Sequence, residues 1–167
     1  MPQFATIEEF YTYKKVIYYS IRVEEDELME TEKFYQRFME NQEYKEEFID
    51  LITWIEHIGE NEGAIPELFR DEDDAQALPP EYRQIERRAK VRKIGYSLRL
   101  YCLRISESIV ILLNGGIKES QKVQDSPDLI GKFRFANKIS KVVTEKLIRK
   151  ELLVGEKKLI GDLELSF

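Results

Sequence analysis

The basic side chains between residues 81 and 122 are the ones whose types and spacing suit chemistry on a phosphate group. Lys90 and Arg92 stand two residues apart, so on a strand they would point to the same face, and Arg99 would join them if the register allows. Guanidinium and ammonium groups gathered in this way hold phosphate oxygens through charge-assisted hydrogen bonds. The alternative is a solvated basic face that pairs with acidic side chains elsewhere, and the residues alone leave both open.

The stretch Leu98–Lys122 must position any such site, because its composition predicts two strands joined by the polar turn Ser106-Glu107-Ser108. Alternation gives the first strand two different faces. One face carries Arg99, Tyr101, Leu103 and Ile105, and the other carries Leu98, Leu100, Cys102 and Arg104. Ile109–Leu113 is apolar throughout, which predicts a central strand covered on both faces. Asn114-Gly115-Gly116 then predicts a bulged exit, and Lys118 follows it.

Three other features carry reactive or metal-binding side chains, and each favours a structural role. Cys102 is the only cysteine and falls inside a predicted strand, which favours a small buried apolar residue over a nucleophile. His57 projects off the apolar stripe of its predicted helix, which favours a surface or helix-end residue over a general base. The acidic run Asp71–Asp74 lacks the alternating ligands and the glycine of a calcium loop, which favours a solvated loop. We therefore expect no metal and no cofactor.

Charge is divided unevenly along the chain, although its net value is only −6. Residues 1–80 hold 7 Lys and Arg against 21 Asp and Glu, whereas residues 81–150 hold 17 against 7. Such segregation produces a dipolar surface that steers anionic ligands toward one side, unless the two halves neutralise each other across their interface. Charge alone favours neither arrangement.

The chain before residue 81 supplies the first elements of the predicted framework. Lys14–Val23 has the β-branched and aromatic content of a strand. Apolar residues at spacings of three and four predict helices over Leu28–Met39 and Glu43–Ile58, the second ended by Gly59. Residues 60–80 predict a loop with a short apolar anchor at Ile65–Phe69.

The second half begins with the basic segment Glu81–Lys93, which would open as a helix and end as a strand. Ser126-Pro127-Asp128 predicts the start of a basic helix that runs to about Lys150. We expect one domain over residues 14–150, with an N-terminal arm at 1–13 and a C-terminal tail at 151–167. The tail would form a hairpin or an arm for a partner.

Two absences bear on the expected location of the protein. No apolar run in the sequence approaches the length of a membrane helix. The first residues also lack the basic start and apolar middle of a signal peptide. We expect a cytoplasmic protein with no membrane partner.

A resemblance to a known family is carried by Val91–Asp125, VRKIGYSLRLYCLRISESIVILLNGGIKESQKVQD. Its basic start, its Tyr-x-x-Arg strand, its Ile-Val-Ile-Leu strand and its closing Gly-x-x-Lys-x-x-Gln-Lys resemble the RelE/ParE superfamily of bacterial toxins, particularly the HigB-like branch. The resemblance implies an α+β, RelE-like fold. That fold is a small antiparallel-rich twisted sheet with two N-terminal helices and one C-terminal helix packed on it.

Active members of this superfamily cleave messenger RNA, commonly on the ribosome, without a metal. The ribose 2′-hydroxyl attacks the adjacent phosphate, so the enzyme must accept a proton, stabilise charge on phosphorus and protonate the leaving 5′-oxygen. The resemblance implies that this work falls to Arg99, Lys90, Arg92 and Lys118. Tyr96 or Tyr101 would stack on a base or take part in proton transfer, and the basic segments add Arg87, Arg88, Lys93 and Lys122 as RNA-binding residues.

The resemblance also implies a partner, a cognate antitoxin that is a small helix-turn-helix protein. One departure concerns the region beyond the last strand, where the family's ribonucleases usually carry a tyrosine, histidine or acidic residue. Here Glu119, Ser120 and Gln121 occupy it, with no tyrosine or histidine to complete the proton transfer. Members of the ParE branch act on DNA gyrase without the ribonuclease residues. The alternative is therefore a non-catalytic binding protein on the same fold, either gyrase-inhibitor-like or an inactive toxin homologue.

Overall fold

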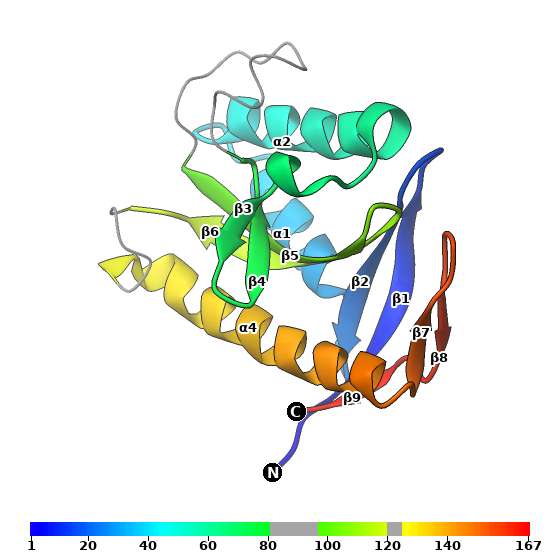
Figure 1. Cartoon of the computed structure of the whole chain (residues 1–167). Helices are drawn as coiled ribbons and strands as arrows, with labels where there is room; N and C mark the ends of the chain where they lie inside the picture. The colour runs from blue at the N-terminus through cyan, green and yellow to red at the C-terminus, as the bar shows by residue number, and fades with distance from the viewer. Residues whose placement is uncertain (81–96, 120–124) are drawn as a thin grey trace.

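The computed structural model describes residues 1–80, 97–119 and 125–167, and Figure 1 shows their arrangement. The strands of the main sheet are β1 (Phe4–Thr12), β2 (Ile17–Val23), β3 (Arg70–Glu72), β4 (Ala75–Leu78), β5 (Leu98–Ser106), β6 (Ile109–Ile117) and β9 (Glu164–Ser166). The helices are α1 (Glu30–Phe38), α2 (Lys45–His57) and α4 (Pro127–Ile148), with short turns at Ile58–Glu62 and Pro66–Leu68. A separate hairpin consists of β7 (Leu152–Val154) and β8 (Leu159–Gly161).

The main sheet has seven strands in the order β3-β4-β5-β6-β2-β1-β9. Neighbouring strands are antiparallel, except that β2 and β6 run parallel. The expected α+β class with a mostly antiparallel sheet is confirmed. The sheet is larger than the small one expected, because segments assigned to an arm, a loop and a tail add strands to it.

Helices cover both faces of the sheet (Figure 1). On one face, α1 and α2 contribute side chains such as Trp54 to one hydrophobic cluster with Leu100 and Cys102. On the other face, α4 packs over Tyr101 and Leu103. The alternation predicted for the strand that begins at Leu98 is therefore confirmed. Cys102 is completely buried, and burial raises the pKa of its thiol, as expected of a small core residue.

The strand β6 is a central strand, with β5 on one side and β2 on the other. Its residues are buried from Ile109 to Gly116, which confirms the prediction from its apolar run. The predicted irregularity is also present, because Leu113 and Asn114 together lie opposite the single residue Tyr101. This bulge precedes the two glycines and bends the end of β6.

Both ends of the chain belong to the sheet, in contrast to the arm expected at residues 1–13. Ala5 and Ile7 are buried at alternate positions of β1, and β1 pairs with β2 on one side and with β9 on the other. The hairpin expected in the tail is present as β7 and β8. The termini lie side by side in Figure 1, where the backbones of Gln3 and Phe167 exchange hydrogen bonds of 2.7 and 2.9 Å. Alternate burial in β1 requires a paired strand, which is why this segment does not remain an arm.

The acidic run is not a loop, as the sequence suggested, but part of the hairpin β3–β4. Arg70 pairs with Ala77 and Glu72 pairs with Ala75, with Asp73-Asp74 as the two-residue turn. Asp73 has φ of 60°, a left-handed conformation that aspartate tolerates better than most residues. Aspartates therefore close this turn as well as carrying charge.

The end of the second predicted helix differs from the expectation. The helix predicted to end at Gly59 ends as α2 at His57 and continues as a turn of π-helix over Ile58–Glu62. Gly59 is buried inside that turn, where a Cβ would lie 2.4 Å from the ring of Tyr13, and Gly63 ends the turn with φ of 81°. The glycine at position 59 thus permits close packing, and the left-handed position is four residues further on.

The basic segment Glu81–Lys93 lies outside the described residues, so the helix and the strand expected in it stay predictions. Within the described ranges, no helix combines the length and apolarity needed to cross a membrane.

The close approach of β6 to β5 at Gly115 gives a test of the register. A Cβ at Gly115 would lie 1.8 Å from the carbonyl oxygen of Arg99, so Gly115→Ala must push the strands apart. We expect it to lower the free energy of unfolding by about 3 kcal/mol or more in urea denaturation. Gly131→Ala is the matched control, because no atom lies within 4 Å of its Cβ position on α4. That variant should gain up to about 1 kcal/mol. Equal effects of the two substitutions would contradict the register.

Candidate functional site

Strand register gathers side chains from three strands on one face of the sheet. Arg70 on β3 is level with Ala77 on β4, and Ala77 is level with Tyr101 on β5. Residues directly opposite each other in paired strands project to the same face, so Arg70 and Tyr101 share the face that α4 covers. Arg99 shares it too, because it stands two residues from Tyr101. Sequence reasoning expected this face for Arg99 and Tyr101 but not for Arg70.

Lys118 reaches the same region from the end of β6. Its backbone N–H donates to the carbonyl oxygen of Ser97 at 2.7 Å, which extends the pairing of β5 and β6 beyond Ile117. Arg99 lies opposite Gly116, so Lys118 comes next on the same face. The side chains of Arg99 and Lys118 are therefore diagonal neighbours across the two strands.

Glu72 completes the group from the end of β3, two residues after Arg70. Its carboxylate interacts electrostatically with Lys118, Arg99 and Arg70. We call Arg70, Glu72, Arg99, Tyr101 and Lys118 the cationic cluster. It joins three positive side chains, one carboxylate and one phenol on a single face.

Arg99 is the innermost cation of the cluster, with 7% of its surface exposed. Burial, and then the nearby charge of Arg70, lower the pKa of its guanidinium to about 10. One of its Nη atoms donates to the carbonyl oxygen of Leu98 at 2.9 Å. Half-buried Lys118 also has a lowered pKa, first because of burial and then because of the Arg99 charge. Positive side chains crowded in this way favour the arrival of an anion.

Glu72 is half-buried, and burial raises the pKa of its carboxyl above the usual value, although Lys118, Arg99 and Arg70 each act to lower it. Among the described residues, no hydrogen bond or ion pair within 4.0 Å holds its carboxylate. The three cations therefore attract it without fixing it in one geometry. A carboxylate in this state is available to accept a proton.

Tyr101 lies at the base of the cluster and is completely buried. Its ring packs edge-on against Phe133 of α4, with ring centroids 6.0 Å apart. Its hydroxyl has no hydrogen-bond partner in the described part of the chain. Burial raises the pKa of that hydroxyl above its ordinary value. A buried hydroxyl without a partner is rare in proteins and costs stability.

Helix α4 begins at this edge of the sheet, and Ser126-Pro127-Asp128 starts it as predicted. One oxygen of Asp128 accepts the N–H of Ile117 at 2.7 Å, and the other pairs with Arg37 of α1 at 2.9 Å. The same carboxylate would lie 2.2 Å from a Cβ at position 116, so glycine there allows Asp128 to approach β6 this closely. These contacts fix the end of β6, from which Lys118 projects.

No protein-family model, curated protein or solved structure matches the chain. The resemblance of Val91–Asp125 to the RelE/ParE superfamily therefore stays a prediction. The geometry of the cationic cluster is independent of that resemblance.

The structure brings together three of the residues predicted from sequence, Arg99, Tyr101 and Lys118. The others lie outside the described residues: Lys90 and Arg92 of the expected catalytic set, and Tyr96, Arg87, Arg88, Lys93 and Lys122 of the expected RNA-binding set. Sequence reasoning missed Arg70 and Glu72, because it assigned them to a loop. The signal was present in residues 70–78, where two short segments flank an Asp-Asp pair suited to a hairpin turn.

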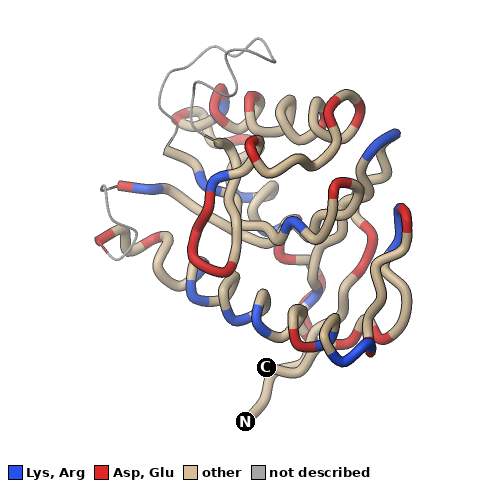
Figure 2. Tube along the Cα trace, viewed as in Figure 1, with Lys and Arg blue, Asp and Glu red and all other residues tan. Residues whose placement is uncertain are grey.

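The acidic residues of 1–80 and the basic residues of 81–150 form few ion pairs in the described structure. Figure 2 shows the acidic hairpin β3–β4 above basic positions of α4. Within the described ranges, one ion pair joins an acidic residue of 1–80 to a basic residue of 81–150, between Asp74 and Lys141 at 4.0 Å. Mutual neutralisation by direct pairing is therefore slight in these ranges.

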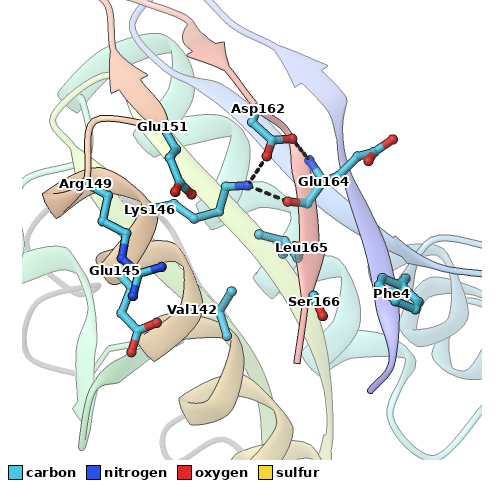
Figure 3. Close-up of a pocket in the computed structure, with 10 residues that line it drawn as sticks. All are labelled: Phe4, Val142, Glu145, Lys146, Arg149, Glu151, Asp162, Glu164, Leu165 and Ser166. Atoms are coloured by element: carbon cyan, nitrogen blue, oxygen red, sulfur yellow. Dashed lines mark hydrogen bonds and ion pairs between the residues drawn. The ribbon is translucent and has the colours of Figure 1, made fainter. Parts of the chain in front are cut away.

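A separate cleft of about 310 Å³ opens near the C-terminal end of α4, beside β9 (Figure 3). Its buried cation, Lys146, is already satisfied, because its Nζ lies 2.6 Å from both Asp162 Oδ2 and the Glu164 carbonyl oxygen. Hydrogen bonds from Lys146 and from the Glu164 backbone lower the pKa of Asp162. The contacts of Lys146 in this cleft therefore connect α4 to β9. In the described part of the chain, no group of His, Cys, Asp or Glu is arranged to hold a metal ion.

The unpartnered hydroxyl of Tyr101 predicts that its removal does not harm the fold. We expect Tyr101→Phe to leave the free energy of unfolding unchanged or to raise it by about 1 kcal/mol, since a buried hydroxyl without a partner costs stability. Tyr18→Phe is the matched control, because Tyr18 is equally buried but donates to the Ile55 carbonyl oxygen at 2.8 Å. It should lose about 1 kcal/mol in the same thermal or urea unfolding. A larger loss for Tyr101→Phe than for the control would show that the Tyr101 hydroxyl has a structural partner.

Proposed function

We propose that this chain is the toxin of a type II toxin–antitoxin pair, a HigB-like member of the RelE/ParE superfamily that cleaves messenger RNA on the ribosome without a metal. The motif in Val91–Asp125 supports the family, and the cationic cluster supports the reaction. The single observation that carries the proposal is the convergence of Arg70, Arg99 and Lys118 on one face of the sheet.

These three cations suit the charge changes of RNA cleavage. When the 2′-hydroxyl oxygen attacks the adjacent phosphate, negative charge grows on the phosphoryl oxygens, and preorganised cations stabilise it. Lys118 and Arg70 are half-buried and would contact the phosphate directly. Arg99 lies deeper and would add its charge from beneath, in surroundings where charge interactions are stronger than in water.

The finer fold assignment belongs to the same proposal. The antiparallel β5–β6 hairpin, with α1 and α2 on one face and α4 on the other, supports a RelE-like framework. Strands β1 and β9 and the β7–β8 hairpin would be additions to it. The proposal includes a small helix-turn-helix antitoxin as partner, and the cytoplasm, where messenger RNA and ribosomes are found, as its location.

The burial of Arg99 favours a second candidate, a non-catalytic binding protein on the same fold. A guanidinium with 7% exposure can serve to shape a basic face for an acidic partner without touching a reacting phosphate. In that case the expressed protein would bind a partner, such as DNA gyrase, and would leave RNA intact.

The proposal predicts that expression without the antitoxin arrests growth and that Arg99→Met relieves the arrest. Methionine keeps most of the side-chain volume and removes a buried charge, so the variant should unfold at the same or a higher temperature. Loss of one charge that stabilises the transition state should lower cleavage of a reporter transcript in a translation extract by about 100-fold. Colony growth, thermal unfolding and mapping of transcript ends measure the three effects.

The control for this experiment is Arg134→Gln, which removes one positive charge from an exposed position of α4. It should arrest growth as the wild type does. Unimpaired growth on expression of well-folded wild-type protein would contradict the proposal. Growth arrest with intact transcripts would instead favour the non-catalytic alternative.

A further inference from the structure

Glu72 is the feature of the cationic cluster that phosphate binding does not explain. A face that only binds RNA gains from every cation and loses from a carboxylate, because affinity comes largely from charge neutralised on the phosphates. Yet the register of β3, β4 and β5 places Glu72 on the face of Arg70 and Arg99, within electrostatic reach of Lys118. No described residue forms an ion pair within 4.0 Å of it.

We propose that Glu72 accepts the proton of the attacking ribose 2′-hydroxyl. This inference rests on the proposed function and assigns the proton acceptor of that site. The sequence region beyond β6, which holds Glu119, Ser120 and Gln121, need not supply it. The acceptor comes instead from the β3–β4 hairpin, on the opposite side of β5 from Lys118.

Glu72 and Lys118 act as the base and the acid of the cleavage step. The Glu72 carboxylate takes the 2′-hydroxyl proton as the 2′-oxygen bonds to phosphorus, and the bond from phosphorus to the 5′-oxygen breaks. The leaving 5′-oxygen takes a proton from the Lys118 ammonium, and both side chains return to their starting states by exchange with water. The products are a 2′,3′-cyclic phosphate and a 5′-hydroxyl. No metal, oxidant or other reactant is required.

The surroundings of Glu72 suit a base. Burial raises the pKa of its carboxyl, which increases its proton affinity, while Lys118, Arg99 and Arg70 oppose that shift and Asp73 adds to it. Tyr101 faces it from β5 with its hydroxyl protonated. The lowered pKa of Lys118 makes its ammonium a better proton donor than an ordinary lysine. Cleavage should therefore fall as the pH drops through the pKa of Glu72, at a higher pH than for an ordinary glutamate.

Asp71 provides a matched control one residue away. It is exposed and pairs with Gln76, which is level with Cys102, so its side chain points to the opposite face of β3. Asp71→Asn and Glu72→Gln each remove one negative charge from the same strand. Only the second removes it from the cationic cluster.

The test compares wild-type protein, Glu72→Gln and Asp71→Asn in a translation extract with a reporter transcript. We expect Glu72→Gln to lower the cleavage rate by about 100-fold or more, since a general base contributes at least that much, and Asp71→Asn to stay within about threefold of wild type. The acidic limb of the pH profile should be absent from the residual activity of Glu72→Gln. Thermal unfolding must show that both variants are folded.

A binding measurement separates catalysis from affinity. The probe is an oligoribonucleotide with 2′-deoxyribose at the cleaved position, which can bind but lacks the attacking hydroxyl. Glu72→Gln should bind it at least as tightly as wild type does, because the site loses a negative charge. Tighter binding together with lost cleavage would support a base rather than a phosphate contact.

The outcomes distinguish this inference from the function on which it rests. A folded wild-type protein that leaves the transcript intact would overturn the proposed function and the role of Glu72 with it. Cleavage by wild type and by Glu72→Gln at equal rates would overturn the role of Glu72 alone. Faster cleavage by Glu72→Gln would also overturn it, and would show that Glu72 competes with the substrate phosphate.

Discussion

The carboxylate of Asp128 connects α4, β6 and α1, the elements that position the candidate site. One oxygen accepts the N–H of Ile117 at the end of β6, and the other pairs with Arg37 of α1. Asp128 also stands in the first turn of α4, where the helix dipole favours negative charge. A Cβ at position 116 would lie 2.2 Å from this carboxylate, so a side chain there would displace Asp128 from its contacts. This joint determines where β6 ends, and so where Lys118 leaves the sheet beside Arg99.

The cationic cluster is held in place at a cost to stability. A pKa of about 10 for Arg99 means that the folded chain disfavours its charged form by roughly 3 kcal/mol at neutral pH. The buried hydroxyl of Tyr101 and the raised pKa of Glu72 act in the same direction. Strongly shifted pKa values of this kind cluster at functional sites, and structural ion-pair networks produce them as well. The extensive core on both faces of the sheet, from Trp54 on one side to Phe133 on the other, is what allows the fold to carry them.

Local patterns in the sequence predicted the centre of this fold well. The apolar run of β6, the alternation of β5 and the start of α4 at Ser126 depend on neighbouring residues, and each matches the structure. The ends of the chain did not follow, because β1 has only two buried positions before its acidic pair Glu8-Glu9, and β9 has only three residues. Their pairing depends on contacts between residues more than 150 positions apart in the chain, which no local pattern contains. Arg70 and Glu72 were missed for a different reason, since the three-residue strand β3 has little pattern of its own and the Asp-Asp turn beside it was the one local signal.

The hairpin β3–β4 also shows why the net negative charge of the chain is a poor guide to the charge at the candidate site. An acidic protein is a poor candidate for binding RNA if its average charge is what matters, but screening limits charge interactions to about 8–10 Å in physiological salt. Within that range Arg70, Arg99 and Lys118 act on one another and on Glu72, while Asp73 also acts on Glu72 and Glu47 also acts on Arg99. The acidic run supplies the turn and the single carboxylate, and its other side chains point away or lie exposed at the hairpin tip. In the proposed reaction the cations of the cluster would stabilise the phosphate, and the Glu72 carboxylate would accept the proton of the attacking hydroxyl.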